Sequence, residues 1–150
     1  MSGLLGEFEC TMDPKGRVKV PAALLKQLNA ADNRRFVLNR GFEKCLILYP
    51  WSEWQEISAR LGKLNMFVQK NRDFVRYFMS GVSEITLDSN DRFLIAKSLQ
   101  EYANISKDIV LSAFQGKIEV WDKAAYEKAI DMNSDDFAGL AEEVMGGSNE

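Results

Sequence analysis

The chain has 150 residues, of which 46% are hydrophobic, so it can bury a core and is not disordered along its whole length. Its net charge of −3 is unevenly spread. Six of the 22 acidic residues and none of the 19 basic residues lie in residues 131–150, which leaves residues 1–130 with a net charge of +3. A basic body beside an acidic tail is compatible with a nucleic-acid partner, although the total charge alone argues against one.

Composition and motifs also narrow the class of protein. No apolar run approaches the length of a membrane span, and no charged-then-apolar leader precedes the first expected strand, so we expect a cytoplasmic protein without a membrane partner. The chain has no His, which excludes the usual general base, nucleophile–His pairs and His metal sites. It also lacks phosphate-binding glycine loops and a nucleophile elbow. We therefore expect no enzyme, no small-molecule substrate, no cofactor and no metal.

The first expected elements are two strands joined by a tight turn. Apolar and polar side chains alternate before and after the turn, as they do in half-buried strands. Between them, Asp13-Pro14-Lys15-Gly16 has the chemistry of a type I turn. The Asp carboxylate accepts a hydrogen bond from a backbone N–H two residues on, Pro fixes φ, and Gly takes the following left-handed position. The resulting bulged hairpin would hold Lys15 and Arg17 outward on a rigid tip.

The first half continues with a short helix over residues 21–28 and strands over residues 36–38 and 45–49. Cys10 and Cys45 are isolated and lie in strand-like patterns. We therefore expect two buried thiols, rather than a disulfide or a zinc site.

Two helices are expected between the halves. Ser52 opens the first, and Gln55 three residues on completes a capping box. The second carries an apolar face, which we expect to pack in the core, while its basic residues form a solvated face or, alternatively, contact DNA phosphates. The members of the apolar face are Phe67, Phe74, Val75 and Phe78.

The second half repeats the plan of the first. Asp122 can cap a helix whose Tyr126 and Ile130 point inward, and Ser134 can cap one more short helix. The other expected elements are a strand over 83–87, a turn over 88–91, a helix over 97–102, and strands over 109–114 and 118–121.

The two halves are related by an internal repeat. Residues 9–17 align without a gap with residues 84–92, and Glu, Thr, Asp and Arg are identical in the two segments. The similarity continues into the following helix and strands. The second turn has Asn90 in place of the first turn's Lys, and Asp91 in place of Gly, at a left-handed position that Asp tolerates better than most residues.

The motif Asp-Pro-Lys-Gly-Arg-Val-x-Val-Pro, repeated about half a chain later, resembles the MraZ family of bacterial transcriptional regulators, which are tandem AbrB-like (SpoVT/AbrB) proteins. The resemblance implies an α+β fold in which two swapped-hairpin repeats form a pseudo-dimeric β-barrel core. The second motif departs from the family pattern, which has Gly before the Arg and Pro four residues after it, where this chain has Asp91 and Ala96. The implied parts are repeat 1 over residues 5–52, a helical connector over 53–81, repeat 2 over 82–125, and a C-terminal helix with an acidic tail over 126–150.

The resemblance also implies a function. Matched residue by residue, the implied DNA-binding residues are Asp13, Lys15, Gly16 and Arg17 in the first turn and Asp88 and Arg92 in the second. Copies would associate into a closed ring and bind short direct repeats in double-stranded promoter DNA, where many weak contacts add through effective concentration. The implied targets are the division and cell-wall gene cluster and the regulator's own gene, which the nucleoid-associated protein would repress.

Other interpretations remain open. Asp13 and Asp88 can be plain turn caps that also hold the Arg four residues on, and Asp91 is expected to compete with phosphate for Arg92 and so weaken the second tip. A structural or interaction oligomer without DNA binding is one alternative, because the second motif is degenerate and the total charge is negative. An AbrB-like antitoxin whose acidic tail engages a toxin is the other.

Overall fold

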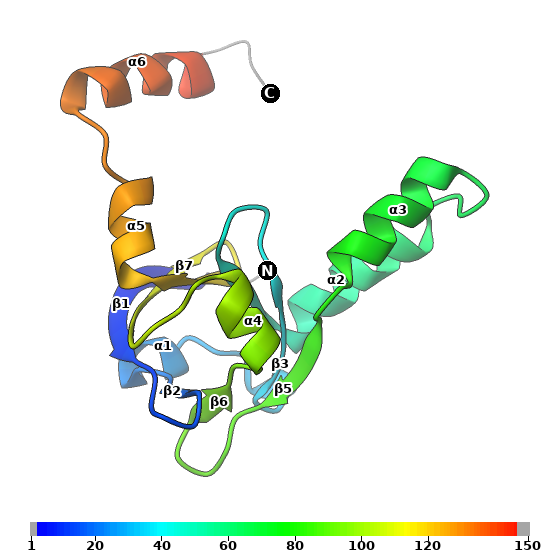
Figure 1. Ribbon diagram of the computed structural model, residues 1–150, viewed down its shortest axis with the longest axis horizontal. Coiled ribbons are helices and arrows are strands. Elements are labelled where there is room, and N and C mark those ends of the chain that lie inside the picture. The colour runs from blue at the N-terminus through cyan, green and yellow to red at the C-terminus, as the bar shows by residue number, and fades with distance from the viewer. Residues whose placement is uncertain (1–2, 147–150) are drawn as a thin grey trace.

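The computed structural model describes residues 3–146, so the last four residues of the expected acidic tail lie outside the described part (Figure 1). The fold is α+β, as expected. The strands are β1 (Leu5–Thr11), β2 (Arg17–Lys19), β3 (Arg35–Arg40), β4 (Leu46–Pro50), β5 (Ser83–Thr86), β6 (Arg92–Leu94), β7 (Asp108–Phe114) and β8 (Lys117–Asp122). The helices are α1 (Ala22–Leu25), α2 (Trp51–Gly62), α3 (Gln69–Phe78), α4 (Lys97–Tyr102), α5 (Lys123–Ala129) and α6 (Ser134–Met145), with a short 3-10 helix, η1 (Ala30–Asp32).

The strand pairing shows that the two halves of the chain exchange strands. The main sheet has the order β1-β7-β8-β4-β3-β5, with antiparallel neighbours, and β2 pairs with β6 in a separate two-stranded ribbon. β1 and β2 share only a bridge between Met12 and Val18, because each pairs with a strand of the other half. The interleaved hairpins are therefore confirmed, but the local hairpin is reduced to its turn.

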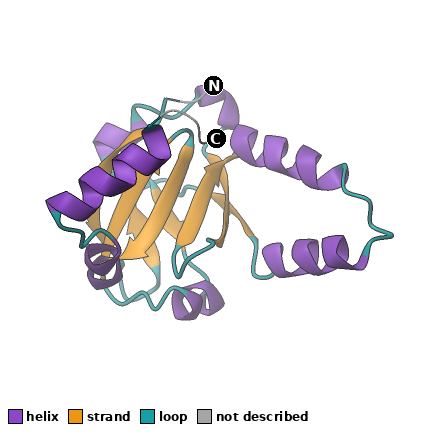
Figure 2. Ribbon diagram, turned by 90° about the horizontal axis from the view of Figure 1, so that it is seen from above, coloured by secondary structure: helices purple, strands orange, loops and turns teal. Residues whose placement is uncertain are grey.

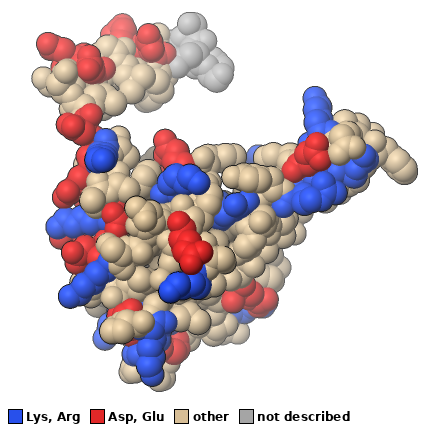
Figure 3. Space-filling model, in the orientation of Figure 1, with Lys and Arg blue, Asp and Glu red and all other residues tan. Residues whose placement is uncertain are grey.

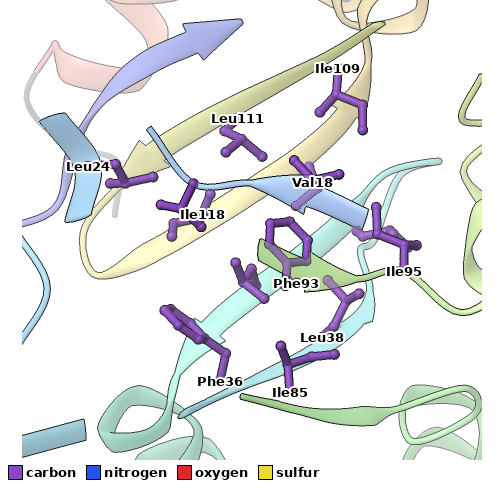
Figure 4. Packing of buried hydrophobic residues seen from close by; sticks show 14 of the residues in the cluster. Val18, Leu24, Phe36, Leu38, Ile85, Phe93, Ile95, Ile109, Leu111 and Ile118 are labelled. Atoms are coloured by element: carbon purple, nitrogen blue, oxygen red, sulfur yellow. The ribbon is translucent and has the colours of Figure 1, made fainter. Parts of the chain in front are cut away.

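Among residues 3–146 the strand pairs do not close the main sheet into a barrel, because β1 and β5 remain its two edge strands. The β2–β6 ribbon instead lies against the core between them. Val18 of β2 and Phe93 of β6 are almost fully buried and point into one cluster with Leu38 and Leu111 of the main sheet (Figure 4). Burying a side chain as large as Phe93 stabilises the fold by roughly 2–3 kcal/mol. The two halves therefore share a single core, which fixes the ribbon that joins the two turns.

Helix α2 begins differently from the sequence prediction. Its N-cap is Pro50, which makes no side-chain capping bond, so the expected Ser52–Gln55 capping box is wrong. The carboxylate of Asp32 takes over this role from η1. It accepts hydrogen bonds from the Ser52 backbone N–H at 2.9 Å and from the Ser52 hydroxyl at 3.2 Å. A cap supplied from 20 residues away cannot be read from the local sequence.

Helices α2 and α3 form an arm that projects from the sheet (Figures 1 and 2). They meet at its base, where Phe78 stacks on Trp54 with ring centroids 6.2 Å apart. Farther out, Phe74 is 46% exposed and Phe67 is 95% exposed. The expectation that the apolar face of the second helix packs in the core is therefore wrong for Phe67 and Phe74, whereas Val75 and Phe78 are partly buried.

The C-terminal helices are also more exposed than expected. Asp122 caps α5 as predicted, accepting from the Ala125 N–H, and Tyr126 packs edge-on against Trp121 at 5.9 Å between ring centroids. Ile130, however, is 56% exposed rather than inward. Helix α6 contains no buried residue, and its N-cap is Asn133, one residue before the predicted Ser134.

Both cysteines are free, as predicted; Cys45 is buried and Cys10 partly so. Burial raises the pKa of the Cys10 thiol to about 11 and that of Cys45 to about 12. Both are therefore protonated, unreactive thiols at neutral pH.

Candidate nucleic-acid interface

The first turn is held by the side chain of Asp13. Its Oδ1 accepts hydrogen bonds from the backbone N–H groups of Lys15 at 3.0 Å and Arg17 at 2.8 Å, and its Oδ2 accepts from Arg17 Nε at 2.7 Å. The backbone closes the turn through Gly16 N–H to the Asp13 carbonyl and Asp13 N–H to the Arg17 carbonyl, both at 2.9 Å. Gly16 has φ +87°, the left-handed value expected. The predicted Asp cap and Asp–Arg pair are thus both present.

The second turn reproduces the same bonds. Asp88 Oδ1 accepts from the N–H groups of Asn90 at 2.8 Å and Arg92 at 3.0 Å, and Asp88 Oδ2 accepts from Arg92 Nε at 2.8 Å. Asp91, at φ +63°, occupies the left-handed position. Asp91 in place of Gly therefore leaves the turn geometry unchanged, because Asp tolerates the left-handed conformation.

The two Asp–Arg pairs fix the charge of the Asp carboxylates and the orientation of the Arg guanidinium groups. The Arg17 backbone N–H is the main cause that lowers the pKa of Asp13 below its ordinary value, and the Arg92 N–H does the same for Asp88. Both carboxylates are therefore charged at neutral pH. Each takes the Nε of its Arg, and within residues 3–146 the terminal nitrogens of Arg17 and Arg92 make no hydrogen bond. Those nitrogens can meet a ligand in the paired geometry that suits phosphate or a guanine edge.

The two turns are tied to each other across the repeat boundary. The Gly16 carbonyl accepts a hydrogen bond from Ile95 N–H at 2.8 Å, and the Asp91 carbonyl accepts one from Val20 N–H at 2.9 Å. The first turn is thus bonded to the residue just after β6, and the second turn to the residue just after β2. The two turns and the ribbon form one rigid unit, with the turns at its opposite ends.

The ribbon has a cationic outer face. In its antiparallel register Arg17 lies opposite Leu94, and Lys19 lies opposite Arg92, while the residues between them point into the core. Lys19 is exposed, and the Arg17 and Arg92 side chains are 31% and 27% exposed. Lys19 was not among the predicted site residues, although the period-two pattern after the first turn already places it beside Arg17. Lys15 is exposed at the first tip, as predicted.

Arg34 contacts the second turn, which the sequence did not reveal. Its Nη2 donates to the Asp88 carbonyl at 2.6 Å and pairs with the Asp91 carboxylate at 2.8 Å. In the structure Arg92 pairs with Asp88, and Asp91 pairs with Arg34. That Asp91 weakens DNA binding by the second tip stays a prediction. Arg34 comes from the first half of the chain, 54 residues before Asp88, so no local motif signals the contact.

The acidic charge of the visible surface is most concentrated on α6 (Figure 3). Acidic side chains dominate the visible face of α6, whereas Lys and Arg are interspersed with acidic side chains over the lower part of the molecule, where the ribbon lies (Figure 3). No cluster of three or more potential metal ligands is found within residues 3–146. Among the helices described, none is long and apolar enough to cross a membrane.

The strand-exchanged α+β core with two Asp–Arg turns defines a tandem AbrB-like protein. The family model described as "MraZ protein, putative antitoxin-like" matches the chain twice, over residues 4–77 and 78–146. The chain therefore belongs to the MraZ family.

Relatives with the name transcriptional regulator MraZ cover nearly the whole chain. The protein of Flavobacterium psychrophilum is 50% identical over 100% of this chain and 96% of its own length. That of Christiangramia forsetii is 48% identical over 97% and 95%. That of Cytophaga hutchinsonii is 39% identical over 93% of each chain.

Proposed function

We propose that this protein is a transcriptional regulator that binds double-stranded DNA sequence-specifically through the two turns and the β2–β6 ribbon. The observation that carries the proposal is the pair of Asp–Arg turns, built with the same hydrogen bonds and locked together by the ribbon. The DNA-contacting residues are those named from the resemblance, Asp13, Lys15, Gly16, Arg17, Asp88 and Arg92, to which the structure adds Lys19 and Arg34 as neighbouring cations.

The shape of the ribbon suits the major groove, which is wide enough to admit a two-stranded antiparallel ribbon. Asp13 and Asp88 act indirectly by fixing their Arg partners, so that little side-chain entropy is lost on binding. Arg17 and Arg92 present their terminal nitrogens to base edges or phosphates, whereas Lys15 and Lys19 suit phosphates as single charges.

One ribbon offers few contacts, so tight binding needs several copies. We propose a ring homo-oligomer on tandem promoter repeats that represses the division and cell-wall gene cluster and the regulator's own gene, acting in the cytoplasm at the nucleoid. Linked copies raise the effective concentration of each next ribbon and can tighten binding by roughly 100-fold or more. No catalytic step and no cofactor are part of this proposal.

The test is fluorescence anisotropy on duplexes from the gene's own upstream region that carry one repeat, several repeats or a scrambled sequence. We expect affinity to rise by about 100-fold from one repeat to several and to fall on scrambled DNA. Equal binding to all duplexes would contradict the proposal. No binding to any of them would favour the interaction oligomer, and co-purification of a small basic partner with α6 would favour the antitoxin.

A further inference from the structure

The arm contains an apolar groove that nothing in the described chain fills. Helices α2 and α3 form the two sides of the arm and are joined by a loop at its outer end (Figure 2). The groove between them is lined by Leu61 of α2, Leu64 just after α2 and Phe74 of α3, beside Phe42, which is 90% exposed. The charged side chains that line it are Arg60 and Lys117, both basic and exposed. An occupant should therefore be apolar on one face and acidic at its border.

Helix α6 has these properties. Phe137 and Leu140 lie on one face at helical spacing and are 64% and 44% exposed. Four of its twelve residues are acidic and none is basic. With no residue of α6 buried, its apolar face is open to solvent in a single copy of the chain. The acidic residues are Asp135, Asp136, Glu142 and Glu143.

We propose that α6 of one copy docks in the α2–α3 groove of a neighbouring copy. Phe137 and Leu140 contact the apolar wall of the groove, and Asp136 and Glu143, which border the same face of α6, lie against Arg60 and Lys117. This is the helix-in-groove mode of recognition, with charge complementarity setting the orientation. It deepens the proposed function, since it rests on assembly of several copies and names the surfaces that join them, but it needs no DNA.

A second copy fits the geometry better than the chain's own α6. Lys117 and the start of α5 lie at opposite ends of β8, roughly 20 Å apart at the rise of a strand. Helix α5 is held at the β1 side by Tyr126 Oη donating to Glu7 at 3.0 Å and by a Lys123–Glu9 ion pair at 3.3 Å. Figures 1 and 2 both place α6 on the side of the molecule away from the arm. A contact between two different surfaces of the same chain is heterologous, and it produces a ring if the rotation closes.

The first test compares two carboxylates added to adjacent positions of α6. Leu140→Asp places a charge on the apolar face, whereas Gly139→Asp places one on the opposite face, where a Cβ atom meets nothing within 4 Å. At micromolar concentration, light scattering should show that Leu140→Asp lowers the native mass to that of one chain, while Gly139→Asp keeps the wild-type mass. Circular dichroism checks that both variants stay folded. A wild-type mass for both variants would overturn the proposal.

The second test separates docking between copies from docking within one. A groove-reversed chain carries Arg60→Glu and Lys117→Glu, and an α6-reversed chain carries Asp136→Lys and Glu143→Lys, two positions one heptad apart that border the Phe137–Leu140 face. Each alone should fail to assemble, and mixing the two should restore the wild-type mass, since each α6 then meets a complementary groove on the other chain. If neither chain loses assembly, or if mixing restores nothing, the proposal is wrong. Because the native mass is measured without DNA, the result tests the assembly surfaces independently of the proposed DNA contacts.

Discussion

Replacing Gly16 by Val should destabilise the first turn and the ribbon to which it is bonded. At φ +87° a β-branched residue costs about 1–2 kcal/mol. A Cβ atom would also lie 3.2 Å from the Ile95 carbonyl oxygen and 2.7 Å from Gln100 Nε2, two groups that hydrogen-bond each other at 2.8 Å. Disturbing that bond adds about 1 kcal/mol. We therefore expect the free energy of unfolding to fall by about 2–3 kcal/mol, and DNA affinity to fall with it.

The assay is urea denaturation followed by tryptophan fluorescence at a fixed protein concentration, since assembly makes stability concentration-dependent. Asp91→Gly is the matched control at the equivalent position of the second turn. It relieves the backbone at φ +63° but removes the exposed pair with Arg34, so the two effects largely cancel and we expect a change below about 1 kcal/mol. A Gly16→Val protein with wild-type stability and wild-type DNA binding would refute the turn geometry.

Three further outcomes are expected. Asp32→Ala removes the cap of α2 and should lower the free energy of unfolding by about 1–2 kcal/mol in the same assay, whereas Asp32→Asn, which keeps an acceptor, should cost less. Because the thiol pKa values of Cys10 and Cys45 are raised to about 11 and about 12, iodoacetamide at pH 8 should modify them at least roughly 100-fold more slowly in the folded protein than in urea. The lowered pKa values of Asp13 and Asp88 mean that their contribution to the turns is complete above the ordinary pKa of 3.8 and is lost as the pH falls through the lowered values. NMR shifts of the turn amides should thus stay constant from pH 8 to 5, and a titration within that range would contradict the Asp–Arg pairs.

The turns could be predicted from the sequence because their chemistry is local. Asp13 caps N–H groups two and four residues on, and Gly16 and Asp91 take the left-handed position that their side chains permit. The period-two and helical patterns placed most elements within a few residues for the same reason. The exchange of strands, in contrast, followed from the family resemblance, since a strand as short as β2 carries no signal of its partner.

The parts that were missed depend on contacts between distant segments. Arg34 reaches the second turn and Asp32 caps α2 only because the fold brings η1 and the segment after it to those places. Ile130 and Phe137 have the spacing of buried residues, yet both are exposed in the single chain. A helical pattern predicts an apolar face but not what covers it.

The central claim, that the turns and the ribbon bind DNA, is tested most directly by the salt dependence of promoter binding in four variants. Lys15→Ala, Arg17→Ala and Arg92→Ala change the proposed interface, and Arg76→Ala changes an exposed Arg of α3 as the matched control. We predict that Lys15→Ala lowers the slope of log K against log salt by about 0.9 for each engaged copy, because one phosphate contact is lost. Arg17→Ala and Arg92→Ala should both lower affinity and reduce the preference for repeat over scrambled DNA, the first more than the second because Lys15 has no cationic counterpart in the second turn. Wild-type affinity and slope in all three interface variants, with the fold intact, would contradict the account.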